Sequence, residues 1–191
     1  MNININMEIG FYNLWLIFVG FVSFAWILMK IGTKLRGTKI ENPEDHANLK
    51  ITIISFIPLL ALLIISIFTP IIIGTLFWIG LFVLSIAGIV YILSIIAFVK
   101  AKKGLTINGI YKFSRNPMYV SLFLIFISFA FMAWQVNPII GIAILCITIL
   151  KGIIIHWMIL GEENFLKKKY GSEYYNYLKK VSRYLGVSKK L

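Results

Sequence analysis

The sequence has little charge, one cysteine and two histidines, and these shortages exclude several classes of protein. Only 14% of its 191 residues are charged, whereas 60% are hydrophobic, a balance too apolar for an ordinary soluble domain. The single Cys146 has no partner in the chain for a disulfide, and His46 and His156 belong to no Cys/His cluster. We therefore expect no disulfide-bonded scaffold and no metal site.

Long apolar runs account for most of the chain, and several reach the roughly 18 to 20 residues that cross a bilayer as a helix. We predict an all-α polytopic membrane protein with about five transmembrane helices, close to residues 9–29, 51–68, 71–99, 118–134 and 139–160. The opening MNININME lacks the basic segment and small-residue cleavage site of a signal peptide, so we expect none there.

The net charge of +12 would favour nucleic acid as the partner of a soluble protein, but here the basic residues lie between the apolar runs. Five lie at 30–50, five at 100–115 and eight at 167–190. With five spans, one orientation places all three segments in the cytoplasm and the N-terminus outside. We therefore expect contacts with anionic membrane lipids, not nucleic acid, and a site that faces the cytoplasm.

The largest polar interval in the second half of the chain is residues 103–119. Asn116-Pro117 stands directly before the predicted fourth span, where Asn is a favoured N-cap and Pro a favoured first helical residue. Capping does not explain Arg115, Tyr111 or Tyr119. If this stretch folds over a ligand, the helix N-terminus would suit a carboxylate, and the two tyrosines could stack on a ring or approach a cation.

Ionisable residues also occur in and after the predicted fifth span. Lys151 lies within the span, where an ionisable group is a functional hypothesis, although snorkelling or a polar neighbour explains it equally well. Glu162 and Glu163 follow, where acids face the negative end of the helix dipole. Either the helix continues through 164–169, or the acids have another partner, such as the ammonium, hydroxyls or positive sulfur of a ligand. His156 shares a helical stripe with Glu163.

The tail has the pattern of an amphipathic helix on the cytoplasmic membrane surface or on the cytoplasmic ends of the spans. Ser172 is a favourable N-cap for it. Apolar and aromatic residues recur at helical spacing opposite Lys179, Lys180 and Arg183, namely Tyr174, Tyr177, Leu178, Val181 and Leu185.

Two motifs stand on either side of an apolar hairpin: GIYKFSRNPMY at 109–119 and EENFLKKKYGSEYYNYLKK at 162–180. Together they resemble the isoprenylcysteine carboxyl methyltransferase family, part of a wider class of small membrane methyltransferases that includes the phospholipid methyltransferases. The family pattern is G-x-Y-x-x-x-R-H-P-x-Y, a two-span hairpin and E-E-x-x-L-x-x-x-(F/Y)-G-x-x-Y-x-x-Y. The resemblance covers about residues 100–185, and the first three spans carry no comparable signature.

The resemblance implies S-adenosylmethionine as methyl donor, bound between the polar stretch and the end of the fifth span. It implies that adenosine is lined, largely through the backbone, by Lys103, Gly104, Leu105 and Thr106. The rest of the donor pocket would come from Tyr111, Arg115, Asn116, Pro117, Met118 and Tyr119, with Glu162 as the acid that touches the donor. The chain would then be one methyltransferase domain, 1–191, with three spans in 1–99 and a donor-binding part in 100–185 that contains the hairpin 118–160 and the cytoplasmic tail.

Two positions depart from the family pattern. Asn116 replaces the usual His; an amide can hydrogen-bond but cannot titrate, which excludes proton transfer there. Met158 stands one helical turn before the acid pair, where members that esterify a prenylcysteine carboxylate have an Arg. His156 or Lys151 could substitute as the carboxylate anchor, although Lys lacks the planar fork of Arg. The acceptor therefore stays open.

We predict methyl transfer to a lipophilic acceptor at the cytoplasmic membrane face, most similar to the isoprenylcysteine carboxyl methyltransferases. A carboxylate or thiolate acceptor needs no general base, whereas an amine must lose a proton, which His156 or Glu163 could take. One alternative is a phospholipid-amine or thiol methyltransferase of the same fold. Further alternatives are an NADPH-dependent sterol-reductase-like enzyme and an inactive membrane homologue.

Overall fold

The protein is all-α in the parts of the chain that the computed structural model describes, residues 10–37, 49–102 and 104–186. Its elements are α1 (Trp15–Arg36), α3 (Leu49–Phe68), α4 (Thr75–Lys100), the short 3₁₀ helix η1 (Gly109–Lys112), α5 (Pro117–Val136) and α6 (Pro138–Lys180). Five of these helices are long and apolar enough to cross a membrane. The predicted all-α, multi-pass membrane architecture is confirmed.

Two helices begin later than their apolar runs. α1 begins at Trp15, because residues 10–14 form a turn whose Leu14 N–H donates to the Thr69 carbonyl (2.9 Å) in the connection after α3. The same pairing holds that connection out of helical conformation, so α4 begins only at Thr75. Hydropathy alone does not reveal either boundary, since the paired residues are themselves largely apolar.

α1 also extends beyond the predicted end of the first span, to Arg36. Gly37 follows with φ 71°, the left-handed conformation in which glycine commonly ends a helix, and its N–H donates to the Lys34 carbonyl (3.2 Å). Basic side chains in the last turn complement the negative end of the helix dipole. The extension carries Arg36 beyond the apolar part of the helix.

α6 runs far beyond the predicted end of the fifth span and continues through residues 164–169, the first of the two possibilities considered for the acid pair. At Gly171 the backbone is non-helical (φ 48°, ψ −123°) and separates the last helical segment from the rest. Tyr174 and Tyr177 of that segment are buried, whereas Lys179 is exposed. The predicted amphipathic helix is present, but it ends at Lys180, before the predicted Val181 and Leu185.

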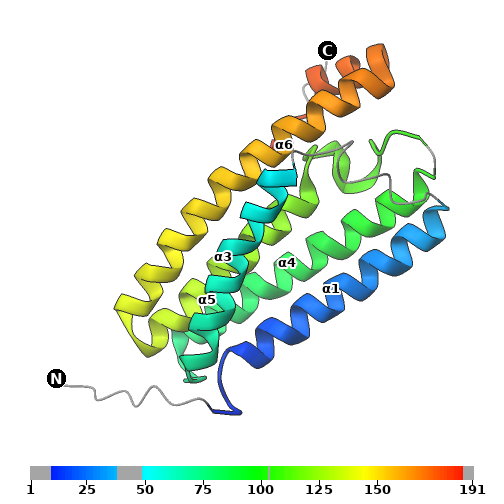
Figure 1. Cartoon of the computed structure of the whole chain (residues 1–191). Helices are drawn as coiled ribbons and strands as arrows, with labels where there is room; N and C mark the ends of the chain where they lie inside the picture. The colour runs from blue at the N-terminus through cyan, green and yellow to red at the C-terminus, as the bar shows by residue number, and fades with distance from the viewer. Residues whose placement is uncertain (1–9, 38–48, 103, 187–191) are drawn as a thin grey trace.

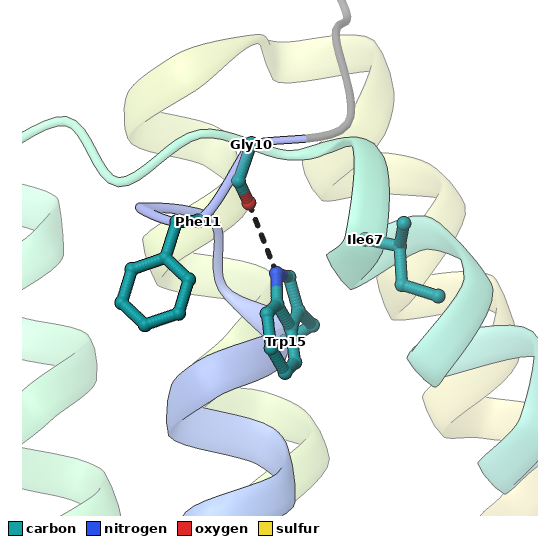
Figure 2. Close-up of a pocket in the computed structure, with 4 residues that line it drawn as sticks. All are labelled: Gly10, Phe11, Trp15 and Ile67. Atoms are coloured by element: carbon teal, nitrogen blue, oxygen red, sulfur yellow. Dashed lines mark hydrogen bonds between the residues drawn. The ribbon is translucent and has the colours of Figure 1, made fainter.

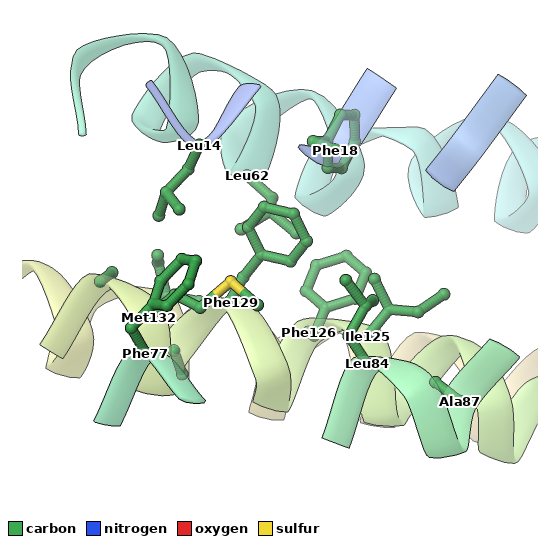
Figure 3. Close-up of a cluster of buried hydrophobic side chains, with 13 residues drawn as sticks. Leu14, Phe18, Leu62, Phe77, Leu84, Ala87, Ile125, Phe126, Phe129 and Met132 are labelled. Carbon is green, nitrogen blue, oxygen red and sulfur yellow. The ribbon is translucent and has the colours of Figure 1, made fainter. Parts of the chain in front are cut away.

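The apolar core lies around α5. In the most apolar 18-residue stretch of α5, 50% of the residues are buried, compared with 11% in the corresponding stretch of α1. Figure 3 shows Phe126 and Phe129 of α5, both fully buried, between side chains of the neighbouring helices. α4 approaches α5 closely at Gly80, where an added Cβ would lie 2.7 Å from the Ser128 carbonyl oxygen. The Ser121 hydroxyl joins the two helices by donating to the Ala87 carbonyl (2.8 Å).

The packing brings the polar segments to one end of the bundle. The ends of α1 and α4, the start of α5 and the connection between them lie there, and the last part of α6 projects beyond them (Figure 1). Residue 10 and the α5–α6 turn lie at the opposite end. That end has an apolar hollow of about 420 Å³ lined by Phe11, Trp15 and Ile67, with the Trp15 indole donating to the Gly10 carbonyl (3.0 Å; Figure 2). It is remote from the two motifs.

Candidate functional site

The first motif folds as a tight connection between α4 and α5. Gly109 has φ 61°, and a Cβ there would lie 3.3 Å from the Ala97 side chain, so glycine suits both the conformation and the close approach to α4. The Tyr177 hydroxyl of α6 donates to the Tyr111 carbonyl oxygen (2.7 Å). The second motif therefore contacts the first directly.

Glu162 lies close to two tyrosines of the first motif, Tyr111 and Tyr119. The Tyr119 hydroxyl donates a hydrogen bond to the Glu162 carboxylate. Burial raises the pKa of Tyr111 well above its usual range, and the negative charge of Glu162 raises it further. Tyr111 is consequently a neutral phenol at physiological pH, and the half-buried Glu162 supplies the negative charge. The fold brings these three predicted donor-pocket residues together.

This cluster has the chemistry of a cation site. A carboxylate that is only partly exposed attracts positive charge more strongly than one in bulk water. The ring faces of Tyr111 and Tyr119 can also attract a cation. The sulfonium and ammonium groups of S-adenosylmethionine fit a site of this kind, so the residues present suit the donor that the motifs imply.

Glu163, the neighbouring acid, has different surroundings. It is 3% exposed, and its two carboxylate oxygens accept from Arg183 Nε (3.1 Å) and Nη2 (2.9 Å). Arg115 Nη2 lies 3.4 Å from one of the same oxygens. This hydrogen bonding raises the pKa of Arg183. The geometry favours a positioning role for Glu163 and Arg115, while the general-base role of Glu163 stays a prediction.

Residues 181–186, here called the C-terminal strap, return to the first motif after α6 ends. The strap carbonyls of Ser182 and Arg183 accept from the Arg115 backbone N–H and the Asn116 side-chain amide, each at 3.0 Å. The Gly186 N–H donates to the Phe113 carbonyl (3.2 Å). Arg183 was expected on the polar face of an amphipathic helix. That expectation is wrong, because the chain becomes extended at Val181 and leaves the helix.

The start of α5 contributes the remaining predicted pocket residues. Asn116 is the N-cap and Pro117 the first helical residue, as expected, but the Asn116 side chain makes no capping hydrogen bond. Pro117 is buried, while Met118 is half-buried beside Tyr119. This segment is thus fixed between α5 and the strap, and its contact with the donor stays a prediction.

The predicted adenosine-binding loop lies between two helices. Leu105 packs against the cluster of Tyr174 and Tyr177 on α6. Gly104 and Thr106 are contacted from the other side by Arg36 of α1, whereas Lys103 falls outside the described residues. Arg36 was missed from sequence, because the family motifs contain no signature in the first three spans. The sequence showed only that Arg36 is one of several basic residues after the first apolar run.

The other two candidate catalytic residues lie on α6 at different heights. Lys151 is 4% exposed and donates to the Ser55 carbonyl of α3 (2.7 Å). Along the helix it is about 16 Å from Glu162 at a rise of 1.5 Å per residue. His156 is nearer, about 9 Å by the same measure, and its Nδ1 is hydrogen-bonded to the Tyr184 hydroxyl of the strap (2.5 Å). The fold therefore brings His156, but not Lys151, toward the strap and the motifs.

Comparison with known proteins assigns the family. A family model described as phospholipid methyltransferase matches residues 63–173, more than half of the chain, and the matched segment includes Glu162 and both tyrosines of the cation site. The chain belongs to the phospholipid methyltransferase family. No curated protein and no solved structure gives a significant match.

Membership in the phospholipid methyltransferase family makes this chain an S-adenosylmethionine-dependent methyltransferase of the membrane. The predicted enzyme class and methyl donor are confirmed, as is the wider class of small membrane methyltransferases. The family that matches is the phospholipid one, which supports the first alternative of the sequence analysis better than the isoprenylcysteine prediction. The sterol-reductase-like interpretation loses its support.

Proposed function

We propose that this protein transfers a methyl group from S-adenosylmethionine to the headgroup amine of a membrane phospholipid. The observation that carries the proposal is the cluster of Glu162, Tyr111 and Tyr119, which joins the two motifs within the family-matched segment. S-adenosylmethionine supplies an electrophilic methyl group on a positively charged sulfur. The protein's own residues bind and orient the reactants and exclude water.

The donor-binding roles follow from charge and shape. Glu162 offsets the positive charge of the donor, and Tyr119 orients the carboxylate by donating to it. Gly104, Leu105 and Thr106 line the nucleoside through their peptide groups. The remaining described residues of the proposed pocket close it between α5 and the strap, namely Arg115, Asn116, Pro117 and Met118.

The amine acceptor is favoured over a carboxylate by two observations. The matching family is described by its phospholipid substrate. In addition, Met158 stands where a carboxylate-binding Arg would be needed, so the bidentate anchor for a prenylcysteine carboxylate is missing. A phospholipid amine requires no such anchor, and a lipid can reach the site sideways from the bilayer.

An amine acceptor must be neutral to attack and must release a proton. His156 is the better placed of the two proposed bases, because both oxygens of Glu163 are engaged by Arg183. The His156 ring is half-buried and hydrogen-bonded to Tyr184. A proton can pass from the amine to the imidazole directly or through the phenol.

We place this site on the cytoplasmic side of the membrane and the N-terminus outside. The basic ends of three helices support this orientation: Arg36 of α1, Lys100 of α4 and Lys179 of α6 lie at the end of the bundle that holds the motifs. Basic residues near span ends favour the cytoplasm. The whole chain, 1–191, then acts as one domain with its donor-binding part in 100–185.

The proposal is tested with purified protein in vesicles that contain phosphatidylethanolamine and a prenylated cysteine, supplied with S-adenosylmethionine labelled on the methyl group. We expect label in a lipid whose headgroup carries methylated nitrogen. Label released by mild base from the prenylated cysteine would instead identify a carboxyl methyl ester. That result would favour the second candidate, an isoprenylcysteine carboxyl methyltransferase, which the paired motifs also suggest.

A further inference from the structure

The loop after α4 is held by a side chain from a distant part of the chain. Arg36, in the last turn of α1, donates from Nε to the Lys102 carbonyl and from Nη2 to the Gly104 carbonyl (2.8 Å). Its Nη1 donates to Thr106 Oγ1 (3.2 Å). The guanidinium group also lies over the Phe98 ring of α4, 4.0 Å from the centroid. One side chain thus contacts three alternate residues of the loop.

Arginine is suited to this task because its planar fork presents several donors in fixed directions. The loop also requires a restraint. Lys102 has φ 48°, a left-handed conformation that is unfavourable for a residue with a side chain. The Arg36 bond to the carbonyl of that same residue stabilises the strained conformation and fixes the direction in which the chain leaves α4.

The opposite side of the loop faces α6. Leu105 and Ile107 pack against the cluster of Tyr174 and Tyr177. In a trans peptide the C=O and N–H groups point in opposite directions. Because the Gly104 carbonyl is turned toward Arg36, the Leu105 N–H points away from Arg36.

The Arg36 charge also reaches the rest of the proposed pocket. It lowers the pKa of Tyr111, opposing the larger effects of burial and of Glu162. Arg36 is therefore close enough to the cation site to be part of the same assembly. It lies outside the family-matched residues 63–173, so the family motifs do not describe it.

We propose that Arg36 is a positioning residue for the methyl donor: it holds the backbone of residues 104–106 in the conformation that binds the nucleoside. This inference rests on the proposed donor pocket. It predicts that α1 contributes to donor affinity without touching the donor. Loss of the fork should release the loop and weaken donor binding, while the chemical step at saturating donor remains unchanged.

The test compares Arg36→Ala and Arg36→Lys with Lys34→Ala in the full-length purified protein. Lys34 is an exposed basic residue in the same helical turn, so its removal deletes the same charge without touching the loop. Calorimetry gives the Kd for S-adenosylmethionine, and methyl transfer to phospholipid gives KM and kcat. Hydrogen exchange of the backbone amides of residues 104–107 reports the order of the loop.

We expect Arg36→Ala to raise the Kd and KM for the donor at least tenfold, with kcat changed less than twofold and faster exchange at 104–107. Arg36→Lys should remain at least fivefold weaker than the unaltered protein, because one ammonium cannot reproduce the three-way fork. Lys34→Ala should match the unaltered protein. Unchanged donor affinity in Arg36→Ala, or full recovery in Arg36→Lys, would overturn the positioning role.

Glu162→Ala, measured in parallel, separates this inference from the pocket itself. If Glu162→Ala weakens donor binding and Arg36→Ala does not, only the role of Arg36 is wrong. If Arg36→Ala weakens binding and Glu162→Ala does not, the proposed cation site is wrong while the loop assignment stands. If neither changes the Kd, both are wrong. If Arg36→Ala does not fold, Arg36→Lys and Arg36→Gln are judged by the same criteria.

Discussion

The dipeptide Asn-Pro begins two helices at opposite ends of the bundle, and the two copies behave differently. Asn137 and Pro138 begin α6, and the Asn137 side chain accepts from the Ile139 N–H (2.8 Å), an ordinary cap. Asn116 and Pro117 begin α5, yet the Asn116 side chain makes no cap and donates instead to the Arg183 carbonyl (3.0 Å). Asn137 is half-buried, whereas Asn116 is 8% exposed.

The difference lies in what surrounds each helix start. At the α5–α6 turn, the Ile139 N–H at the helix start needs an acceptor, and the Asn137 side-chain oxygen satisfies it. At the start of α5 the strap presents the Arg183 carbonyl oxygen, which needs a hydrogen-bond donor. The Asn116 amide supplies that donor, so the residue joins the strap to the motif. The Asn137 side chain therefore bonds within its own helix. The Asn116 side chain instead joins the start of α5 to the distant strap, and this contact is here called the tertiary junction.

The largest effect should follow from removing the anchor of the tertiary junction. Glu163→Ala leaves Arg183 and Arg115 without their shared carboxylate, and we expect a loss of about 2 to 3 kcal/mol in stability. The value lies below the roughly 3 to 5 kcal/mol for breaking a fully buried ion pair, because Arg183 is partly exposed. Thermal and denaturant unfolding in detergent measure it, with the exposed Glu173→Ala as control. Equal stability of the two variants would show that the cluster does not hold the strap.

The next effect concerns donor binding at the same end. Glu162→Ala should weaken the Kd for S-adenosylmethionine at least tenfold, about 1.4 kcal/mol, by removing a charged partner of the donor. Stability should change much less than in Glu163→Ala, because Glu162 is only half-buried. Calorimetry and thermal unfolding of the same samples measure both quantities. Unchanged affinity in a folded Glu162→Ala would remove this residue from the site.

A matched pair of substitutions tests the comparison itself. Asp is as good an N-cap as Asn, so Asn137→Asp should change stability by less than about 0.5 kcal/mol. An ionised Asp has no donor for the Arg183 carbonyl, so Asn116→Asp should lose about 1 kcal/mol and bind the donor several-fold more weakly. Thermal unfolding and calorimetry on both variants provide the measurement. Equal effects at the two positions would mean that Asn116 is merely a cap.

A small effect is also expected between the two ends of the bundle, at Lys151. Its ammonium donates to the Ser55 carbonyl between α6 and α3. An apolar side chain of similar size loses this hydrogen bond but also avoids the cost of burying a charge, so the two effects largely offset each other. Lys151→Met should therefore change stability by less than about 1 kcal/mol and leave donor affinity unaltered. A tenfold fall in kcat with normal donor binding would instead establish the functional role of Lys151 that was considered from the sequence.

Much of the fold could be predicted, because span length and hydropathy depend on short stretches of chain. Boundaries were less accurate where a distant segment intervened, as where the pairing of Leu14 with Thr69 delays both α1 and α4. The length of α6 was left open, because the acids Glu162 and Glu163 indicated either a continuing helix or another partner. The structure has both: the helix continues, and the acids have partners on α5 and the strap. The family resemblance implied one pocket for Glu162 and the tyrosines of the first motif, and the fold brings these residues together.

By itself, the sequence determined five apolar helices, the helix start at Asn116-Pro117 and the two motifs of a membrane methyltransferase, since each depends on neighbouring residues or on spacing along the chain. Only the tertiary structure decided which partner each polar group finds. In the folded chain the Asn116 side chain bonds to the strap, Glu163 accepts from Arg183, and Glu162 accepts from Tyr119. It also brought Arg36 of α1 to a loop more than sixty residues away. A buried polar group bonds to whatever donor or acceptor packing places beside it, and that placement comes from the whole fold.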